Sequence, residues 1–470
     1  MKNILMVAIQ PQRFLDQLHF AEELNIKAKG NINIQFFIGE KVYDLYKLEI
    51  DKLAFEIIND LEFEEQENNN YVKSNNRLII NLKKSLNQEQ KNQMRKYLNF
   101  LKLTKLYSRR LLKQEKLYLE KLELEYVKIK KLVIDNNINI FLINGDRHLG
   151  LEPVFLKISK ILNIPSIIPY LVDFADKERI LLSGYKTEKI KKGFFISKYI
   201  LDSQQNLNYK IVQNRLFYPH ITGNALQQFG VLTSNPYVMG CGESDILCLN
   251  NKSNVEKYIR NGVENDKIHL IGDISFDRLY NNFVQREATK KEILNKYSLN
   301  KSKEIIIIAL PQLAEHRLLS WDDHWKEINF LMEELSTTKK NILISLHPKM
   351  DKLKYDFLEF QYNCKILNER LAEVLPIADI FVATFSSTVV WAVLCGIKTI
   401  VVDFYDFNYT MYDFLRSIII VNKKDEFREI LKNIFKKYIK FEEDWKLLSK
   451  DTVFDGNVIK RYIDLFEKLS

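Results

Sequence analysis

Short runs of continuously apolar residues, each followed by a helical pattern, constrain the fold of this chain more than any other feature. In the second half of the sequence they occupy residues 303–311, 341–348, 379–385, 398–404 and 417–422. Strands that are apolar on both faces are typical of parallel sheets covered by helices on both sides. This half is therefore expected to form a doubly wound α/β domain.

The first half shows the same alternation with one long interruption. Strand patterns at 3–9, 32–40 and 138–144 flank or enclose a largely helical stretch at about 41–136. The turn after the first strand, at residues 8–14, contains no glycine, which excludes a dinucleotide-binding fingerprint there. We expect a second Rossmann-like domain that carries a helical insertion.

A length of 470 residues also fits two domains. The charged stretch 285–302 separates the two series of strands. The sequence therefore predicts an N-terminal domain at 1–290 and a C-terminal domain at 291–470, the latter ending in one more helix.

Composition and missing motifs exclude several classes of protein. None of the four cysteines belongs to a CxxC pair, which indicates reduced thiols rather than a disulfide framework or a zinc site. No Asp-x-Asp sequence is present to clamp a divalent metal, and no P-loop, HExxH or GxSxG motif occurs. The N-terminus does not resemble a secretory signal, and no apolar run fits a membrane span. A cytoplasmic protein without a bound metal is expected.

The net charge of +9 is concentrated in one stretch. Residues 83–113 hold ten Lys or Arg against the single acid Glu89, so the rest of the chain is balanced. This stretch is either a solvated helix face or a contact with an anionic membrane, at whose inner face the protein would then work. Nucleic acid is a poor partner, because no basic motif interleaved with aromatic residues is present.

Ligands of open parallel sheets bind outside the carboxyl ends of the strands, so polar residues after the predicted strands form the candidate site. His347 ends one strand and is followed by Pro348, which stops the strand there. Its imidazole could donate to the phosphate of a leaving group, or it could bond a neighbouring carbonyl at a plain turn. The Lys349 side chain could either contact the phosphate or point into solvent.

Two serines follow another predicted strand. Ser386 and Ser387 lie between the strand at 379–385 and an apolar helix. Their hydroxyls could cap the free N–H groups of that helix, or hydroxyls and N–H groups together could bind a phosphate. Their place in the same half as His347 favours the phosphate.

One carboxylate follows a strand of the first half. Asp146 comes directly after Gly145, which permits a tight turn, and could act as a general base on an acceptor hydroxyl. Alternatively it pairs with Arg147 or caps the next helix; His148 and Glu152 are weaker candidates for the base. Secondary contacts to a donor are expected from four more residues that follow strands of the second half: Gln312, Glu315, Arg317 and Asp403.

Two of these segments resemble motifs of a known enzyme class. SLHPKMD (345–351) and ATFSSTVVWAVLCG (383–396) are similar to the HP and SS motifs of GT-B bacterial sialyltransferases and Kdo transferases of surface polysaccharide synthesis, and CDP-glycerol-type polymerases share a related pair. The resemblance implies that His347, Ser386 and Ser387 contact the phosphate of a cytidine nucleotide donor and that Asp146 is the base. It implies a metal-independent transfer of a CMP-activated nonulosonic or ulosonic acid to a surface-glycan or lipid-linked acceptor.

A second resemblance points to the hydrolysing UDP-N-acetylglucosamine 2-epimerases, which also have the GT-B architecture. INGDRHLG (143–150) and the segment 261–277 are similar to elements of those enzymes. However, their Ser-Gly-Gly element is replaced by Ser-Ser-Thr at 386–388, and their His-Val-Glu-Ala-Gly stretch is absent from 164–174. Epimerase activity is thus the alternative function, and a non-enzymatic accessory protein that kept the fold is a third.

Overall fold

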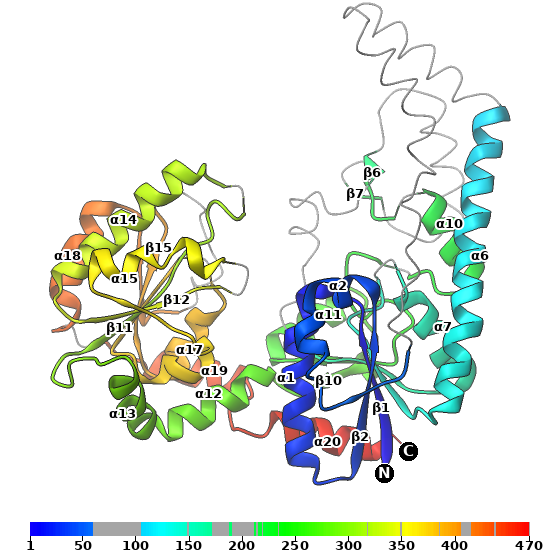
Figure 1. The fold of residues 1–470 in the computed structure, drawn as a ribbon, viewed down its shortest axis with the longest axis horizontal. Coiled ribbons are helices and arrows are strands. Elements are labelled where there is room, and N and C mark those ends of the chain that lie inside the picture. The colour runs from blue at the N-terminus through cyan, green and yellow to red at the C-terminus, as the bar shows by residue number, and fades with distance from the viewer. Residues whose placement is uncertain are drawn as a thin grey trace, which may run out of the picture. The chain divides into compact units, whose positions relative to one another are not determined.

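A computed structural model describes thirteen stretches of the chain, and these carry the account that follows. They are residues 1–59, 105–147, 150–171, 188–189, 211–212, 215–218, 220–233, 235–316, 318–347, 350–384, 386–405, 415–436 and 439–469. The chain forms two compact units, the first from residues 1–271 with 459–470 and the second from 272–458. Each is built on a central sheet flanked by helices (Figure 1).

Parallel strands form the main sheet of the first unit, in the order β10-β9-β5-β4-β1-β2-β3. They are β1 (Lys2–Ala8), β2 (Ile32–Ile38), β3 (Glu56–Ile57), β4 (Ile140–Leu142), β5 (Ser166–Ile168), β9 (Ile246–Leu249) and β10 (Ile268–Leu270). The chain winds outward from β1 on one side and then outward from β4 on the other. The winding direction therefore reverses between β1 and β4, the position where open α/β sheets bind ligands.

Helices cover both sides of this sheet. They are α1 (Pro11–Ala28), α2 (Glu40–Ile50), α6 (Lys105–Asp135), α7 (Glu152–Leu162), α10 (His220–Phe229), α11 (Lys252–Arg260) and α20 (Val458–Lys468). A small antiparallel sheet has the order β6-β8-β7, with β6 (Glu188–Lys189), β7 (Ile211–Val212) and β8 (Arg215–Leu216). The expected insertion is helical in α6, whereas β3, within the same stretch, pairs with β2 in the main sheet. Residues 60–104 of the insertion lie outside the described stretches.

The second unit repeats the winding, with parallel strands in the order β13-β12-β11-β14-β15-β16. They are β11 (Ile305–Ala309), β12 (Asn341–Ser345), β13 (Lys365–Ile366), β14 (Ile380–Ala383), β15 (Lys398–Val402) and β16 (Ile418–Val421). Here the direction of winding reverses between β11 and β14. The predicted doubly wound fold of this half is confirmed.

Alternate residues of these strands enter one apolar core. Ile306, Ile342 and Ile380 pack in it with Leu331 of α14 (Trp321–Thr337) and Leu431 of α18 (Lys424–Ile434). The remaining helices of the unit are α12 (Ile274–Val284), α13 (Arg286–Lys296), α15 (Phe357–Tyr362), α16 (Leu371–Val374), α17 (Thr388–Leu394) and α19 (Glu442–Asp451). Because strand residues on both faces are buried, the strands are apolar throughout rather than alternating.

The two units differ from the expected division in two places. The second unit begins at Gly272 rather than near residue 291, because α12 packs on α16 of that unit. The charged stretch that follows α12 forms the helix α13. At the other end, α20 packs on the first unit beside α1 (Figure 1). The Tyr462 hydroxyl accepts a 2.9 Å hydrogen bond from the Tyr170 amide, and its ring meets Phe20 edge-on at 4.7 Å. An amphipathic pattern predicts a helix but not which core the helix covers.

Candidate functional site

The carboxyl edge of the second sheet brings most of the predicted site residues together. Ala309 of β11 pairs with Ser345 of β12, and Ile308 pairs with Val382 of β14, so the three strands end level with one another. Adjacent strands lie about 4.8 Å apart. The edge carries His347 after β12, Gln312 and Glu315 after β11, Ser386 and Ser387 after β14, and Asp403 after β15. These residues therefore surround the reversal point between β11 and β14.

His347 is exposed at this edge. Its carbonyl accepts a 2.8 Å hydrogen bond from the Met350 amide, and its own amide contacts the Met350 sulfur at 3.4 Å. Met350 is buried in the core, so its side chain anchors the turn. Met350 thus holds the backbone of the turn. Pro348 and Lys349 lie outside the described stretches.

The two serines have different roles. The Ser386 hydroxyl accepts from the Thr388 amide at 3.3 Å and lies 2.7 Å from the Thr388 hydroxyl, so it caps the first free N–H group of α17, although Ser387 holds the N-cap position. Ser387 is exposed, and its side chain makes no capping hydrogen bond. The two interpretations of the serine pair therefore apply to different residues: capping to Ser386, and an available hydroxyl to Ser387.

The secondary candidates are held by neighbours in the loops of this edge. The Gln312 side-chain oxygen lies 3.0 Å from Nε2 of His316. Asp403 is buried, and its amide donates to the Val421 carbonyl at 2.9 Å. The Glu315 carboxylate accepts from the Tyr355 hydroxyl at 2.6 Å. Arg317 lies outside the described stretches.

Two residues that no sequence motif marks support Glu315. Tyr355 and His324 are fully buried, and the Tyr355 hydroxyl lies 2.8 Å from Nε2 of His324. Burial raises the pKa of Tyr355, and the Glu315 carboxylate raises it further; burial lowers the pKa of His324. Both are neutral at neutral pH. No motif marks the pair, because they lie 31 residues apart and meet only through the fold.

Asp146 is placed differently from what a general base requires. It is 3% exposed, and its carboxylate accepts from the amides of Gly240 at 3.0 Å and Gly242 at 2.8 Å and from the Ser244 hydroxyl at 2.8 Å. A Cβ at Gly242 would lie 2.5 Å from the Asp146 carbonyl oxygen, so only glycine fits there. Arg147 donates to the Tyr237 carbonyl at 3.0 Å. The carboxylate thus anchors the loop 240–244, and the expected role of Asp146 as the general base stays a prediction.

A second carboxylate lies at the reversal point of the first sheet. Glu152 opens α7 after β4, and its carboxylate accepts a 2.5 Å hydrogen bond from the Gln10 side chain, which follows β1. The pair bridges the point between β1 and β4 where the winding reverses. Gln10 was missed from the sequence because an amide after a strand is common and carries no distinctive pattern.

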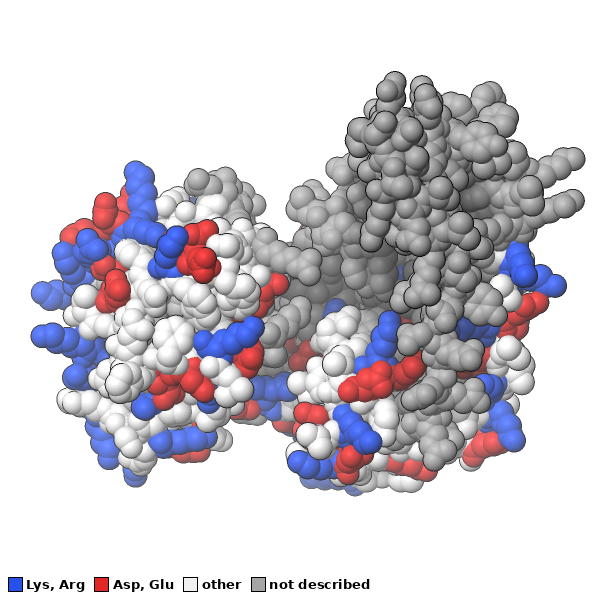
Figure 2. Space-filling model, turned by 45° about the horizontal axis from the view of Figure 1, so that its top comes forward, with Lys and Arg blue, Asp and Glu red and all other residues white. Residues whose placement is uncertain are grey.

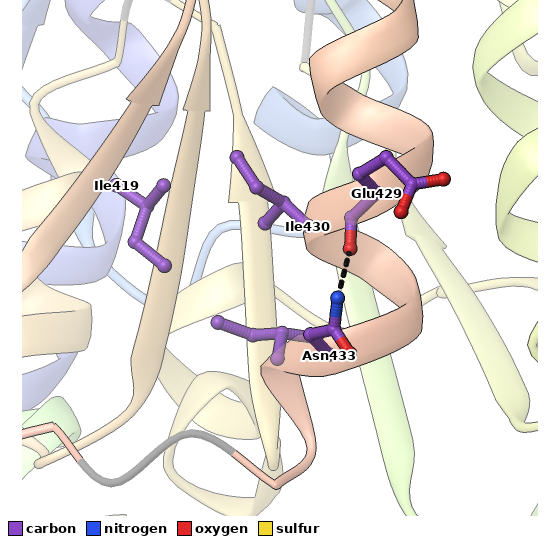
Figure 3. Close-up of a pocket in the computed structure, with 5 residues that line it drawn as sticks. Ile419, Glu429, Ile430 and Asn433 are labelled. Atoms are coloured by element: carbon purple, nitrogen blue, oxygen red, sulfur yellow. Dashed lines mark hydrogen bonds between the residues drawn. The ribbon is translucent and has the colours of Figure 1, made fainter.

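A pocket of about 220 Å³ lies elsewhere in the second unit (Figure 3). It is lined by Ile419 of β16 and by Glu429, Ile430, Asn433 and Ile434 of α18. Lys398, the first residue of β15, donates to the Ile434 carbonyl at 3.2 Å, which places this end of α18 at the amino edge of the sheet. The pocket is mainly apolar and lies away from the candidate site.

Charge and metal chemistry add two observations. Basic and acidic side chains are interspersed over the described surface of the face drawn in Figure 2. Among the described residues no group of three His, Cys, Asp or Glu could hold a metal ion, and no helix has the length and apolar character needed to cross a membrane. None of the four cysteines, all in the described part of the chain, forms a disulfide. Burial raises the pKa of the Cys248, Cys364 and Cys395 thiols to about 12, so these three are unreactive.

Comparison with known proteins shows the fold. No protein-family model and no curated protein matches the sequence. The structure is similar to UDP-GlcNAc 2-epimerase from Neisseria meningitidis bound to UDP-GlcNAc, with a TM-score of 0.51 and 10% identity over 99% of this chain and 100% of that chain. It is also similar to a putative UDP-N-acetylglucosamine 2-epimerase from Listeria monocytogenes, with a TM-score of 0.50 and 9% identity over 100% of this chain and 98% of that chain. For the wall teichoic acid polymerase TagF the TM-score is 0.48, with 14% identity over 99% of this chain and 88% of that chain. The two epimerase likenesses show that the chain has the GT-B fold of two Rossmann-like domains.

Proposed function

We propose that the protein is a glycosyltransferase that moves a sugar from a nucleotide donor to a surface-glycan or lipid-linked acceptor without a metal ion. The donor is a CMP-activated nonulosonic or ulosonic acid, as the His-Pro and Ser-Ser segments suggest. One observation carries the proposal: His347 and Ser387 present exposed polar groups at the carboxyl edge of one sheet, beside its reversal point. Nucleotide ligands of open α/β sheets bind at such points.

The reaction would use these groups on the leaving side. An acceptor oxygen attacks the anomeric carbon, the bond from that carbon to the phosphate oxygen breaks, and CMP departs. The His347 imidazole donates a hydrogen bond or a proton to the departing phosphate, and the Ser387 hydroxyl hydrogen-bonds the same group. Stabilising charge that develops only in the transition state is what accelerates such a step.

The proton of the acceptor hydroxyl must pass to a base. Asp146, which the sequence suggested, has both carboxylate oxygens engaged by three donors. Glu152 lies at the same edge of the first sheet; it is 2% exposed, and the uncharged Gln10 side chain donates to its carboxylate. We therefore assign the base to Glu152.

Replacing Glu152 with glutamine should lower kcat by about 10²–10⁴-fold, because the amide cannot take the proton. Glu49→Gln, at the exposed last turn of α2 and so away from the carboxyl edge of the sheet, is the matched control and should leave kcat unchanged. Steady-state kinetics with saturating donor measure both variants. Full activity in Glu152→Gln would remove this residue from the mechanism.

A thermal-shift screen with CMP, CDP, UDP and GDP tests the proposed function itself. A ligand that binds the native state raises the midpoint of unfolding, and a cytidine nucleotide is expected to raise it most. If none of the four raises the midpoint, the chain is an accessory protein that has kept the fold.

Epimerisation is the second candidate function, favoured by the likeness to UDP-GlcNAc 2-epimerase over nearly the whole chain. Incubation with UDP-GlcNAc in the absence of any acceptor separates the two functions. Release of UDP together with a free sugar product supports the epimerase and overturns the transferase.

The basic stretch 83–113 would bring the enzyme to an anionic membrane on the cytoplasmic side, where a lipid-linked acceptor is available. Most of this stretch lies outside the described residues, so the proposal rests on its composition of ten basic residues and one acid. Co-sedimentation with phosphatidylserine vesicles should occur at low salt and disappear at about 0.5 M salt, where screening is strong. Equal binding to neutral vesicles would argue against the electrostatic contact.

A further inference from the structure

A chain of hydrogen bonds at the carboxyl edge of the second sheet ends on a buried carboxylate oxygen. His324, Tyr355 and Glu315 follow one another, with 2.8 Å between Nε2 and the tyrosine hydroxyl and 2.6 Å from that hydroxyl to Oε1 of Glu315. The second oxygen, Oε2, is buried and has no hydrogen-bond partner in the described part of the chain. Buried polar atoms are almost always hydrogen-bonded, so this unpaired oxygen calls for an explanation, such as a bound water or ion or a role in the site.

The direction of the hydrogen bonds follows from the chemistry of the three groups. An ionised carboxylate only accepts, so the Tyr355 hydroxyl donates to Glu315. Its oxygen then accepts from the Nε2–H group of a neutral His324. Burial lowers the pKa of His324, and burial and the nearby carboxylate raise the pKa of Tyr355. The imidazole and the phenol are therefore both uncharged near neutral pH. The network carries one negative charge, on Glu315.

Aromatic packing fixes this network in place. The Tyr355 ring lies 5.0 Å from Trp325 and 5.9 Å from His324, measured between ring centroids. Leu313 is fully buried in the loop after β11, and its carbonyl accepts from the Leu318 amide at 2.8 Å, which closes the turn that carries Glu315. Glu315 is thereby held at the same sheet edge as His347, with one oxygen oriented by Tyr355 and the other left for a ligand.

We propose that Oε2 of Glu315 accepts a hydrogen bond from a hydroxyl group of the bound nucleotide-sugar, and that Tyr355 and His324 are positioning residues that orient it. The inference rests on the proposed function and refines it. A carboxylate repels phosphate, so the expected contact between Glu315 and the donor involves a hydroxyl group rather than the phosphate. The hydroxyl belongs either to the ribose or to the transferred sugar, and both offer the same donor chemistry.

Calorimetric titration of the full-length protein separates the two sources. The first comparison is CMP against 2′,3′-dideoxy-CMP, and the second is CMP-N-acetylneuraminic acid against CMP. If the ribose is the partner, the wild type should prefer CMP to its dideoxy form by about 10–100-fold, the value of a hydrogen bond to a charged group. If the sugar is the partner, a preference of that size should appear in the second comparison instead.

The variants test the assignment through these preferences, which a purely structural role would leave unchanged. Glu315→Ala should reduce the relevant preference to less than about 3-fold, and Glu315→Gln, which keeps the shape, serves if the alanine variant fails to fold. Tyr355→Phe should reduce it by about 3–10-fold, because the carboxylate is no longer oriented. Tyr362→Phe is the matched control: Tyr362 is also a buried tyrosine of this unit and donates to Asn329 at 3.1 Å.

Unchanged preferences in folded Glu315 variants, or a loss as large in Tyr362→Phe as in Tyr355→Phe, would overturn the inference. If these preferences stay unchanged while His347→Ala weakens nucleotide binding, the proposed function stands and only the role of Glu315 falls. If neither CMP nor CMP-N-acetylneuraminic acid binds the wild type, the proposed donor and the inference fail together.

Discussion

Replacing His347 with alanine should lower kcat by about 10²–10⁴-fold, the usual loss when a group that donates to the leaving phosphate is removed. The fold should survive, because the imidazole is exposed and the turn is anchored by Met350 and its backbone contacts. Steady-state kinetics with saturating donor and acceptor give kcat, and thermal unfolding gives the midpoint, which should move by less than about 2 °C.

The control for this prediction is a variant of a second histidine. His19 lies on α1 of the first unit, next to Glu22 and Glu23, and has no place in the proposed site. His19→Ala should leave kcat unchanged. Transfer at the wild-type rate in a folded His347→Ala variant would remove the histidine from the mechanism, whatever the fold resembles.

Asp146→Asn should cost about 2–4 kcal/mol of the free energy of unfolding, the largest expected effect on stability. The amide keeps the shape but converts one acceptor oxygen into a donor. That donor must face either the Gly240 amide or the Gly242 amide and the Ser244 hydroxyl, all of which donate to the carboxylate. Urea unfolding monitored by circular dichroism measures the loss.

Activity separates an anchoring carboxylate from a catalytic one. At a temperature where Asp146→Asn is folded, its kcat should stay within about 10-fold of the wild type, far above the loss expected for a general base. Asp135→Asn, at the exposed end of α6, is the control and should change neither quantity. Wild-type stability combined with a kcat lowered more than about 10³-fold would restore Asp146 as the base.

The fold and part of the site could be predicted because they depend on local patterns. Apolar runs predict buried parallel strands, and a proline or a serine pair after such a run marks the end of a strand. His347, Ser387 and Glu315 were predicted as site residues in this way, and the level ends of β11, β12 and β14 place them on one edge, while their roles stay predictions.

What the sequence could not predict depends on contacts between distant segments. The enclosure of Asp146 comes from a loop about 95 residues further along, and the support of Glu315 comes from Tyr355, 40 residues away. Similarly, α20 covers the first unit through Tyr462, which lies 292 residues beyond Tyr170. Spacing within one sequence carries no information about such pairs.

A structure determined with a bound cytidine nucleotide tests the central claim most directly. The account predicts a phosphate within about 3.2 Å of the His347 imidazole and of the Ser387 hydroxyl, beside the reversal point between β11 and β14. A nucleotide whose phosphate lies away from both residues, for example at the amino edge near Ile419 and Ile430, would contradict it.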